Sequence, residues 1–336
     1  MIIDEINGYL DINEPGMKKV KDELNEFKHI INDNKTIPVC ILSHMYDPKR
    51  SKMLVELMDS DIDREYVIFT YEDQKELYEQ FKSKVNVHYI PTDNPVYLTL
   101  SGKRQYILEW AQNNGHEDAF FSEDDCYSYY LPIGGIGGTG NFRNKKYPMT
   151  LGFMYSFWEF LIKKYSLTYS GPVNNMEFTF RNLDENPFIK HLAQVVQTVH
   201  INVQSCKTNN INFDHDAGWD DYDMIIQQCV HNKGTHGIIF SYVTPALKSG
   251  VSAMSSDADK LAKRCENNTN ALINKWGLSL VREDTKKGLY NAKVNWNNIR
   301  KAYNNNVDLT KLIGMNHESA KKFIVSNNET QELGEW

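Results

Sequence analysis

Short apolar runs alternate along the chain with segments whose apolar residues recur at helical spacing. The runs predict strands, and the periodic segments predict the helices between them. The expected strands are 37–43, 64–70, 85–90 and 118–122, and the expected helices are 49–61, 72–84 and 100–115. This alternation predicts an α/β fold with a mixed, mostly parallel sheet that is covered by helices.

The pattern divides the chain into three parts. Residues 1–36 contain an amphipathic helical pattern and are expected to form an N-terminal helical extension. Residues 37–300 are expected to form the main domain, with one half at 37–126 and a second at 127–300. Residues 301–336 are polar and rich in Asn and Glu, which favours a loosely held C-terminal tail.

Regularity is weaker in the second half of the main domain. Helices are expected at 149–165, from Asp220 or Asp221 onward, and at 255–277, with C-terminal additions after them. Five glycines lie within residues 131–148, without the spacing of a Walker loop or a dinucleotide fingerprint. This segment is interpreted either as a flexible linker or as a lid or acceptor loop beside the carboxylates at 123–125.

Composition narrows the class of protein. No run of eighteen apolar residues occurs, so no membrane-spanning helix is expected. The acidic N-terminus lacks the basic region of a signal peptide. The five cysteines form no CxxC pair, which predicts free thiols and a reducing cytoplasm.

Charge is unevenly distributed along the chain, whose net formal charge is -7. Residues 1–126 carry 14 Lys and Arg against 25 Asp and Glu, while the remainder carries 23 against 19. An acidic protein is not an obvious nucleic-acid binder, but the basic excess of the second part can face a polyanion locally.

Three consecutive carboxylates, Glu123, Asp124 and Asp125, directly follow the fourth expected strand. Ligands of such sheets bind at the carboxyl ends of the strands. Carboxylates there can share a Mg²⁺ or Mn²⁺ ion that also binds a diphosphate. An acidic turn on the surface is the alternative reading. Upstream, Lys103 and Arg104 lie near the start of the helix that leads to this strand, where a phosphate is also favoured.

The order of these elements resembles the nucleotide-sugar-binding half of glycosyltransferases with the GT-A fold. "IPVCILSHMYDPKR" resembles their first strand and nucleotide-contacting loop, and "SEDDC" stands where their Asp-x-Asp motif stands. The resemblance implies that Ser43 and Arg50 contact the nucleotide, together with Lys103, Arg104, Glu123 and Asp124. It implies that carboxylates of this triplet bind the metal: Glu123 and Asp125 occupy the outer positions of the motif, and Asp124 is an alternative ligand because Glu replaces the first Asp.

The second half carries two further resemblances. "WDDYDMIIQQCVHNKG" is similar to the family's later acidic motif, which implies that Asp220 or Asp221 is the general base of an inverting enzyme. His236 follows that helix and is expected as an additional metal ligand. The segment from 248 to 299 resembles phage glycosyltransferases associated with TET/JBP-type oxygenases. That likeness implies transfer of a hexose or pentose from a nucleotide sugar such as UDP-glucose to a 5-hydroxymethylpyrimidine such as hydroxymethylcytosine in DNA.

Other functions fit the same carboxylates. One is a GT-A enzyme that glycosylates a glycan, a protein or a cell-wall polymer. Another is a metal-dependent nuclease or nucleotidyltransferase, and a third is a binding module without turnover. The remaining histidines are read as ordinary polar residues, with His215 as a candidate near the acceptor, and no Ser-His-Asp arrangement follows from spacing. Tyr127, Tyr129 and Tyr130 are expected either to stack on a base or sugar or to belong to the core.

Overall fold

The structure is a computed structural model. It describes residues 2–10, 17–30, 36–132, 146–172, 188–195, 197–214, 219–232, 234–238, 241–243, 258–286 and 288–332. The chain forms two compact units. The first unit comprises Met1–Asn94, Tyr106–Lys207 and Thr235–Pro245, and the second comprises Pro95–Gln105, Thr208–Gly234 and Ala246–Trp336. The predicted lid segment at 131–148 lies mostly outside the described residues.

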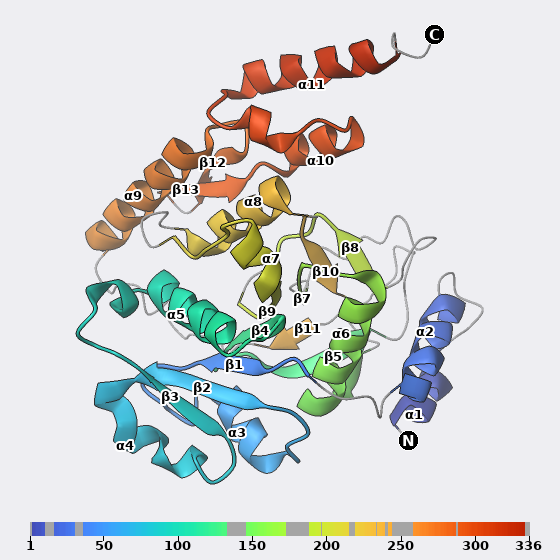
Figure 1. The fold of residues 1–336 in the computed structure, drawn as a ribbon, viewed down its shortest axis with the longest axis vertical. Coiled ribbons are helices and arrows are strands. Elements are labelled where there is room, and N and C mark those ends of the chain that lie inside the picture. Colours follow the sequence, from blue (N-terminus) through green and yellow to red (C-terminus); the bar gives the residue numbers. More distant parts are fainter. Residues whose placement is uncertain are drawn as a thin grey trace. The chain divides into compact units, whose positions relative to one another are not determined.

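The described part of the first unit is built on an eight-stranded sheet in the order β3-β2-β1-β4-β9-β7-β10-β8. Its strands are β1 (Val39–Leu42), β2 (Tyr66–Tyr71), β3 (Asn86–Ile90), β4 (Asp118–Glu123), β7 (Tyr169–Pro172), β8 (Ile189–His191), β9 (Val199–Asn202) and β10 (His236–Ile238). The first four strands are parallel, and β9 is antiparallel to β4 (Figure 1). The predicted α/β class with a mixed sheet is confirmed.

Helices cover both faces of this sheet. The described helices of the first unit are α1 (Ile2–Tyr9), α2 (Met17–Ile30), α3 (Lys52–Asp59), α4 (Lys75–Tyr78), α6 (Leu151–Tyr165), most of α5 (Leu100–Asn113) and α7 (Val203–Thr208) except its last residue. On one face, Trp110 of α5 contacts Phe69 of β2, with ring centroids 5.3 Å apart. On the opposite face, Trp158 of α6 contacts Phe120 of β4 at 4.8 Å. β1 and β2 are buried along their full length, which explains their continuous apolar runs.

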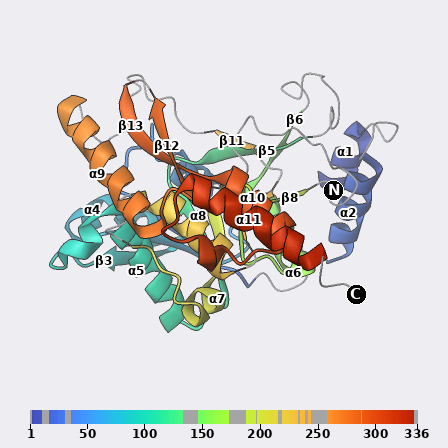
Figure 2. The same cartoon turned by 90° about the horizontal axis from the view of Figure 1, so that it is seen from above.

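The N-terminal helices belong to the same hydrophobic core. Ile3 and Ile6 of α1 and Leu24 of α2 are buried within it. Phe27 of α2 packs on the aromatic rings of α6, 5.1 Å from Phe157 between centroids. Figure 2 shows α1 and α2 side by side.

A small antiparallel sheet of the first unit has the order β11-β5-β6. Its strands are β5 (Tyr127–Pro132), β6 (Lys146–Met149) and β11 (Ser241–Val243). Tyr129 of β5 is fully buried, so it belongs to the core, whereas Tyr127 and Tyr130 are half-buried.

The second unit contains mainly helices and one described hairpin. Its helices are α8 (Asp220–His231), α9 (Ala258–Trp276), α10 (Trp296–Asn304) and α11 (His317–Glu332), and the short α7 (Val203–Thr208) ends at its border. The hairpin pairs β12 (Val281–Lys286) with β13 (Leu289–Val294). α9 packs along this hairpin (Figure 2).

Two sequence expectations differ from the structure. The helix expected at 72–84 is divided into η1 (Glu72–Gln74), α4 and η2 (Glu79–Phe81), with further 3-10 turns at η3 (Pro95–Leu98) and η5 (Leu309–Leu312). The prediction of a loosely held tail is wrong for residues 304–332. Leu312, Ala320 and Ile324 are buried there because η5 and α11 each turn a narrow apolar stripe inward.

Candidate active site

The acidic triplet lies at the carboxyl edge of the parallel strands. β4 pairs with β1 so that Glu123 stands opposite Leu42, the last residue of β1. Asp124 and Asp125 follow in a turn, and Ser43 follows β1 at the same edge. The sheet register therefore brings the triplet beside the segment that joins β1 to α3, as the sequence predicts for a ligand site.

Asp124 is held by hydroxyl groups. Its Oδ2 accepts hydrogen bonds from Ser43 Oγ at 2.5 Å and from Ser51 Oγ at 2.6 Å. The Ser43 hydroxyl also lies 2.7 Å from the Tyr78 hydroxyl in a buried contact. Burial raises the pKa of Asp124, although the two serine hydrogen bonds act to lower it.

Asp125 and Glu123 flank this anchored residue. Burial raises the pKa of Asp125, and the neighbouring charge of Asp124 raises it further. The Cys126 thiol lies 3.7 Å from Asp125 Oδ1. Glu123 is half-buried at the last position of β4. Two further carboxylates thus stand at the same strand end as Asp124, and oxygen ligands grouped in this way favour a hard cation there.

The segment after β1 is fixed from a second direction. Gln74 Oε1 accepts hydrogen bonds from the Met45 backbone amide at 2.9 Å and from Thr70 Oγ1 at 3.2 Å. Gln74 Nε2 lies 2.8 Å from His44 Nδ1. Arg50 is exposed on the same segment, and its charge acts to lower the pKa of both Asp124 and Asp125.

A separate ionic cluster lies within the second unit. Arg104 Nη1 pairs with Asp220 Oδ2 at 2.7 Å and also with Asp221 Oδ1. The Arg104 side chain is only 7% exposed. Burial raises the pKa of Asp221; Arg104 opposes this shift and Asp220 adds to it. The structure therefore joins Arg104, which the sequence assigned to a phosphate, to Asp220 and Asp221, which it assigned to the general base.

Contacts at the first turn of α5 fix the position of Arg104 on that helix. Thr99 Oγ1 accepts a hydrogen bond from the Gly102 amide at 2.9 Å, which caps the helix. A Cβ atom at Gly102 would lie 1.8 Å from the Val96 carbonyl oxygen, so only glycine fits between η3 and the helix. Lys103, also expected to meet phosphate, is half-buried on the same turn.

Asp223 lies on the same helix as Asp220 and Asp221, but its contacts are structural. The residue is buried, and its carboxylate accepts hydrogen bonds from Trp276 Nε1 at 2.6 Å and from Lys275 Nζ at 2.9 Å. Lys275 also pairs with Asp214 at 2.9 Å. These contacts tie α8 to α9 within the second unit and explain the third acidic residue of the motif without a substrate.

The structure does not bring His236 to the triplet. Through Ser170 and His200, the register aligns His236 of β10 with Phe120 of β4. β7 and β9 lie between β10 and β4, so the two strands are about 14 Å apart at the usual strand spacing. The ring of His236 instead lies 5.0 Å from that of His191 on β8. His215 lies outside the described residues.

A Ser-His-Asp sequence of contacts, not anticipated from spacing, does occur in the sheet. His200 Nε2 lies 2.8 Å from Asp118 Oδ1, and His200 Nδ1 lies 3.3 Å from Ser170 Oγ. Ser170 and His200 are fully buried, and Trp158 Nε1 donates to Ser170 Oγ at 2.9 Å. Since no substrate can reach Ser170, this chain of hydrogen bonds serves the sheet.

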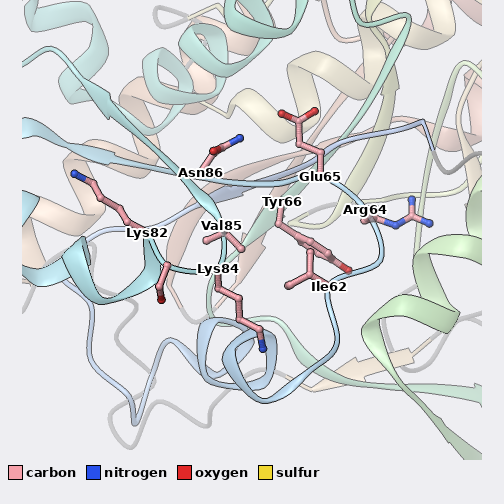
Figure 3. Close-up of a pocket in the computed structure, with 9 residues that line it drawn as sticks. Ile62, Arg64, Glu65, Tyr66, Lys82, Lys84, Val85 and Asn86 are labelled. Atoms are coloured by element: carbon pink, nitrogen blue, oxygen red, sulfur yellow. The ribbon is translucent and has the colours of Figure 1, made fainter.

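A pocket of about 230 Å³ lies at the opposite edge of the sheet, where β2 and β3 begin (Figure 3). Its two lysines are engaged by the protein. Lys84 Nζ donates to the carbonyl oxygens of Met58 and Ser60 at the end of α3, both at 2.5 Å, and Lys82 pairs with Glu79 at 2.7 Å. The pocket therefore contributes nothing to the triplet.

The described residues contain neither a group of side chains arranged to hold a metal ion nor a helix able to span a membrane. No three or more His, Cys, Asp or Glu side chains among them are grouped so as to hold a metal ion. No helix in the described ranges has the length and apolarity needed to cross a bilayer. The five cysteines, all described, are buried and free, as predicted.

Comparison with models of known protein families finds no match, and comparison with curated protein sequences finds none. Similar solved structures include a mycobacterial protein, with TM-score 0.43 and 8% identity over 80% of this chain and 86% of that one. Another is glucosyl-3-phosphoglycerate synthase from Mycobacterium tuberculosis with Mn²⁺, UDP and phosphoglyceric acid, with TM-score 0.41 and 9% identity over 80% and 89%. A third is 4-diphosphocytidyl-2C-methyl-D-erythritol synthase from Anaerococcus prevotii, with TM-score 0.35 and 8% identity over 70% and 96%.

Proposed function

We propose that the protein is a metal-dependent glycosyltransferase, which moves a hexose or pentose from a nucleotide sugar, with UDP as the expected nucleotide, to a hydroxyl group. One observation carries this proposal. A surplus of carboxylates, Glu123 to Asp125, stands at the carboxyl end of β4, directly beside the segment that follows β1. That edge is where an α/β sheet binds a nucleotide, and carboxylate oxygens there are suitable ligands for the hard cation that a diphosphate requires.

The carboxylates fit a Mg²⁺ or Mn²⁺ ion. Such ions are held by one or two carboxylates, with water and substrate phosphates completing the shell, so a group of three protein ligands is not needed. Glu123 and Asp125 would hold the ion. When bound, it neutralises the charge that develops on the departing nucleoside diphosphate. Arg50 and Ser43, on the segment after β1, are assigned to the nucleotide.

The acidic pair of α8 is assigned the proton transfer. Asp220 or Asp221 would accept the proton of the attacking hydroxyl if the sugar configuration inverts. The raised pKa of Asp221 supports this role, because a carboxylate with a higher pKa is a stronger base. Arg104, which contacts both carboxylates, orients them and would take up a phosphate charge with Lys103.

The preferred acceptor is a 5-hydroxymethylpyrimidine in DNA. Support comes from the likeness of residues 248–299 to the phage enzymes and from the basic excess after residue 126. The hydroxymethyl group lies in the major groove, where an enzyme can reach it. Transfer to a glycan, protein or cell-wall polymer is the alternative acceptor class.

The test is a screen of radiolabelled nucleotide sugars with Mn²⁺, Mg²⁺ or EDTA. The acceptors are hydroxymethylcytosine DNA, hydroxymethyluracil DNA, unmodified DNA and a mixture of glycans and proteins. Metal-dependent label in modified DNA alone supports the full proposal, and label in another acceptor supports the transferase but not its DNA substrate. Cleavage of DNA or transfer of a nucleotidyl group without sugar transfer would show that the carboxylates serve a nuclease or nucleotidyltransferase.

A further inference from the structure

We infer that Asp124 is a positioning residue, which holds segment 43–51 in place, and that the metal is bound by Glu123 and Asp125 instead of Asp124. The clamp itself follows from contacts within the first unit. Its consequence for catalysis rests on the proposed function, in which that segment receives the nucleotide.

Asp124 makes hydrogen bonds in three directions. Its Oδ2 accepts from the hydroxyls of Ser43 and Ser51, at 2.5 and 2.6 Å. Its amide donates to the Leu42 carbonyl oxygen at 3.2 Å, and its carbonyl oxygen accepts from the Met53 amide at 3.0 Å. One residue of the β4 turn therefore joins the end of β1 to the first turn of α3.

The two serines mark the ends of the clamped segment. Ser43 directly follows β1, and Ser51 directly precedes α3. Between them, the carbonyl oxygen of Asp47 accepts hydrogen bonds from the Ser51 amide at 2.7 Å and the Arg50 amide at 2.8 Å. Asp124 thus closes a loop whose interior is already folded on itself, with Arg50 exposed on it.

Withdrawing Asp124 to a metal would leave this arrangement unsatisfied. Ser43 and Ser51 are each 2% exposed, so their hydroxyls would lose a charge-assisted partner without gaining water. Within the described part of the chain, no comparable serine pair holds Asp125, which accepts a weak hydrogen bond from the Cys126 thiol at 3.7 Å. A preformed loop also lowers the ordering cost of ligand binding, so the clamp should act on donor affinity.

Asparagine separates the two roles. Its amide oxygen has two lone pairs and can accept from both serines, but it is a poor ligand for a hard cation. Asp124→Asn should keep the clamp, Asp124→Ala should break it, and Asp125→Asn is the matched change at the neighbouring carboxylate. Mn²⁺ binding is measured by electron paramagnetic resonance titration with UDP present, and donor KM and kcat are measured on the four proteins.

The expected results distinguish the residues. Asp124→Asn keeps Mn²⁺ affinity within about threefold of the native protein, whereas Asp125→Asn weakens it at least about tenfold. Asp124→Ala raises the donor KM about tenfold with kcat nearly unchanged, as expected for lost preorganisation. If Asp124→Asn weakens Mn²⁺ binding as much as Asp125→Asn does, Asp124 is a metal ligand and the inference is overturned.

A second arm does not depend on catalysis. Asp124→Ala, Ser51→Ala and the double variant form a cycle in urea unfolding, and the two changes should be coupled by about tenfold in the unfolding constant. Additive effects would refute the clamp. A native protein that binds neither Mn²⁺ nor UDP would refute the proposed function, while the cycle would still decide the clamp. Should Asp124→Ala not fold, a cycle of Ser43→Ala and Ser51→Ala replaces it, because both hydroxyls donate to the same oxygen of Asp124. Loss of both should cost more than the sum of the single losses, and additive effects would again refute the clamp.

Discussion

The two acidic clusters of this protein are held in different ways. In the first unit, neutral serine hydroxyls hold Asp124 beside Asp125. In the second unit, a single buried arginine, Arg104, holds both Asp220 and Asp221. Burial raises the pKa of Asp124, Asp125 and Asp221 alike. In each cluster the cost of burying a charged carboxylate therefore outweighs the hydrogen bonds and charges that favour its ionised form.

At Glu159, in the core of the first unit, cationic partners outweigh the effect of burial on the pKa. It pairs with Arg64 at 2.8 Å and with Lys163 at 2.7 Å. Burial acts to raise the pKa of Glu159, but hydrogen bonds from Lys163 and Thr36 and the charge of Arg64 outweigh it, so the pKa is lowered. The ratio of cations to carboxylates thus separates a structural ion pair from clusters that can still attract a cation or accept a proton.

The largest effect is expected at the triplet. Asp125→Asn removes a proposed metal ligand and should lower sugar transfer by roughly 100-fold or more, because metal stabilisation of a leaving diphosphate amounts to several kcal/mol. The free energy of unfolding should not fall, because a neutral asparagine avoids the cost of burying a charge, which is the effect that raises the Asp125 pKa. Initial rates with saturating Mn²⁺ and thermal unfolding measure the two quantities. Full activity would leave the triplet without a catalytic role.

Arg104→Ala tests the other cluster. Removing the cation leaves two carboxylates facing each other, which should destabilise the protein by about 3 kcal/mol, the lower end for a broken buried pair because Asp221 is 36% exposed. The folded-state pKa of Asp221 is already raised above 3.8 and should rise further. The deficit should therefore be largest at neutral pH and shrink as the pH falls through that raised pKa. Urea unfolding at several pH values measures it, and a pH-independent deficit would contradict the explanation.

Glu159→Gln tests the balanced pair, with an expected loss of about 2 kcal/mol at neutral pH. The folded pKa of Glu159 lies below its ordinary value of 4.5, so ionised Glu159 stabilises the protein above pH 4.5. This contribution is lost as the pH falls through the folded pKa. The difference between native and variant protein should accordingly vanish in acid. Protonation removes a stabilising charge at Glu159, whereas at Asp221, whose pKa is raised, it removes a destabilising one. Chemical unfolding from pH 3 to pH 8, a range of about five units, is the measurement.

The sequence predicted the half of the fold in which pattern and burial agree. β1 and β2 are buried on both faces, so their apolar runs were readable. β7 was missed because "YSGP" reads as a turn. The structure explains its glycine, since a Cβ at Gly171 would lie 2.8 Å from the Thr198 carbonyl oxygen of the neighbouring chain segment. Close backbone approach of this kind leaves no hydrophobic signal.

The same limit applies to the candidate site. The sequence located the triplet and the acidic pair of α8, because runs of carboxylates are visible in it. It did not supply their partners. Ser43 lies 81 residues from Asp124, and Arg104 lies 116 residues from Asp220. Such pairings are set by sheet order and helix packing, and these determine whether a carboxylate is clamped, paired or left with surplus charge.

The smallest effect is expected at Arg50, the exposed cation whose charge reaches Asp124 and Asp125. Arg50→Ala should change the unfolding free energy by less than about 0.5 kcal/mol, as is usual for an exposed side chain. Donor KM should rise about threefold, since a solvent-screened cation contributes little to a diphosphate. Salt sharpens the test, because added NaCl should raise the native KM toward that of the variant. If Arg50→Ala instead lowers kcat as strongly as Asp125→Asn, the nucleotide contacts of segment 43–51 are catalytic, and the hydroxyl-held cluster works with a cation after all.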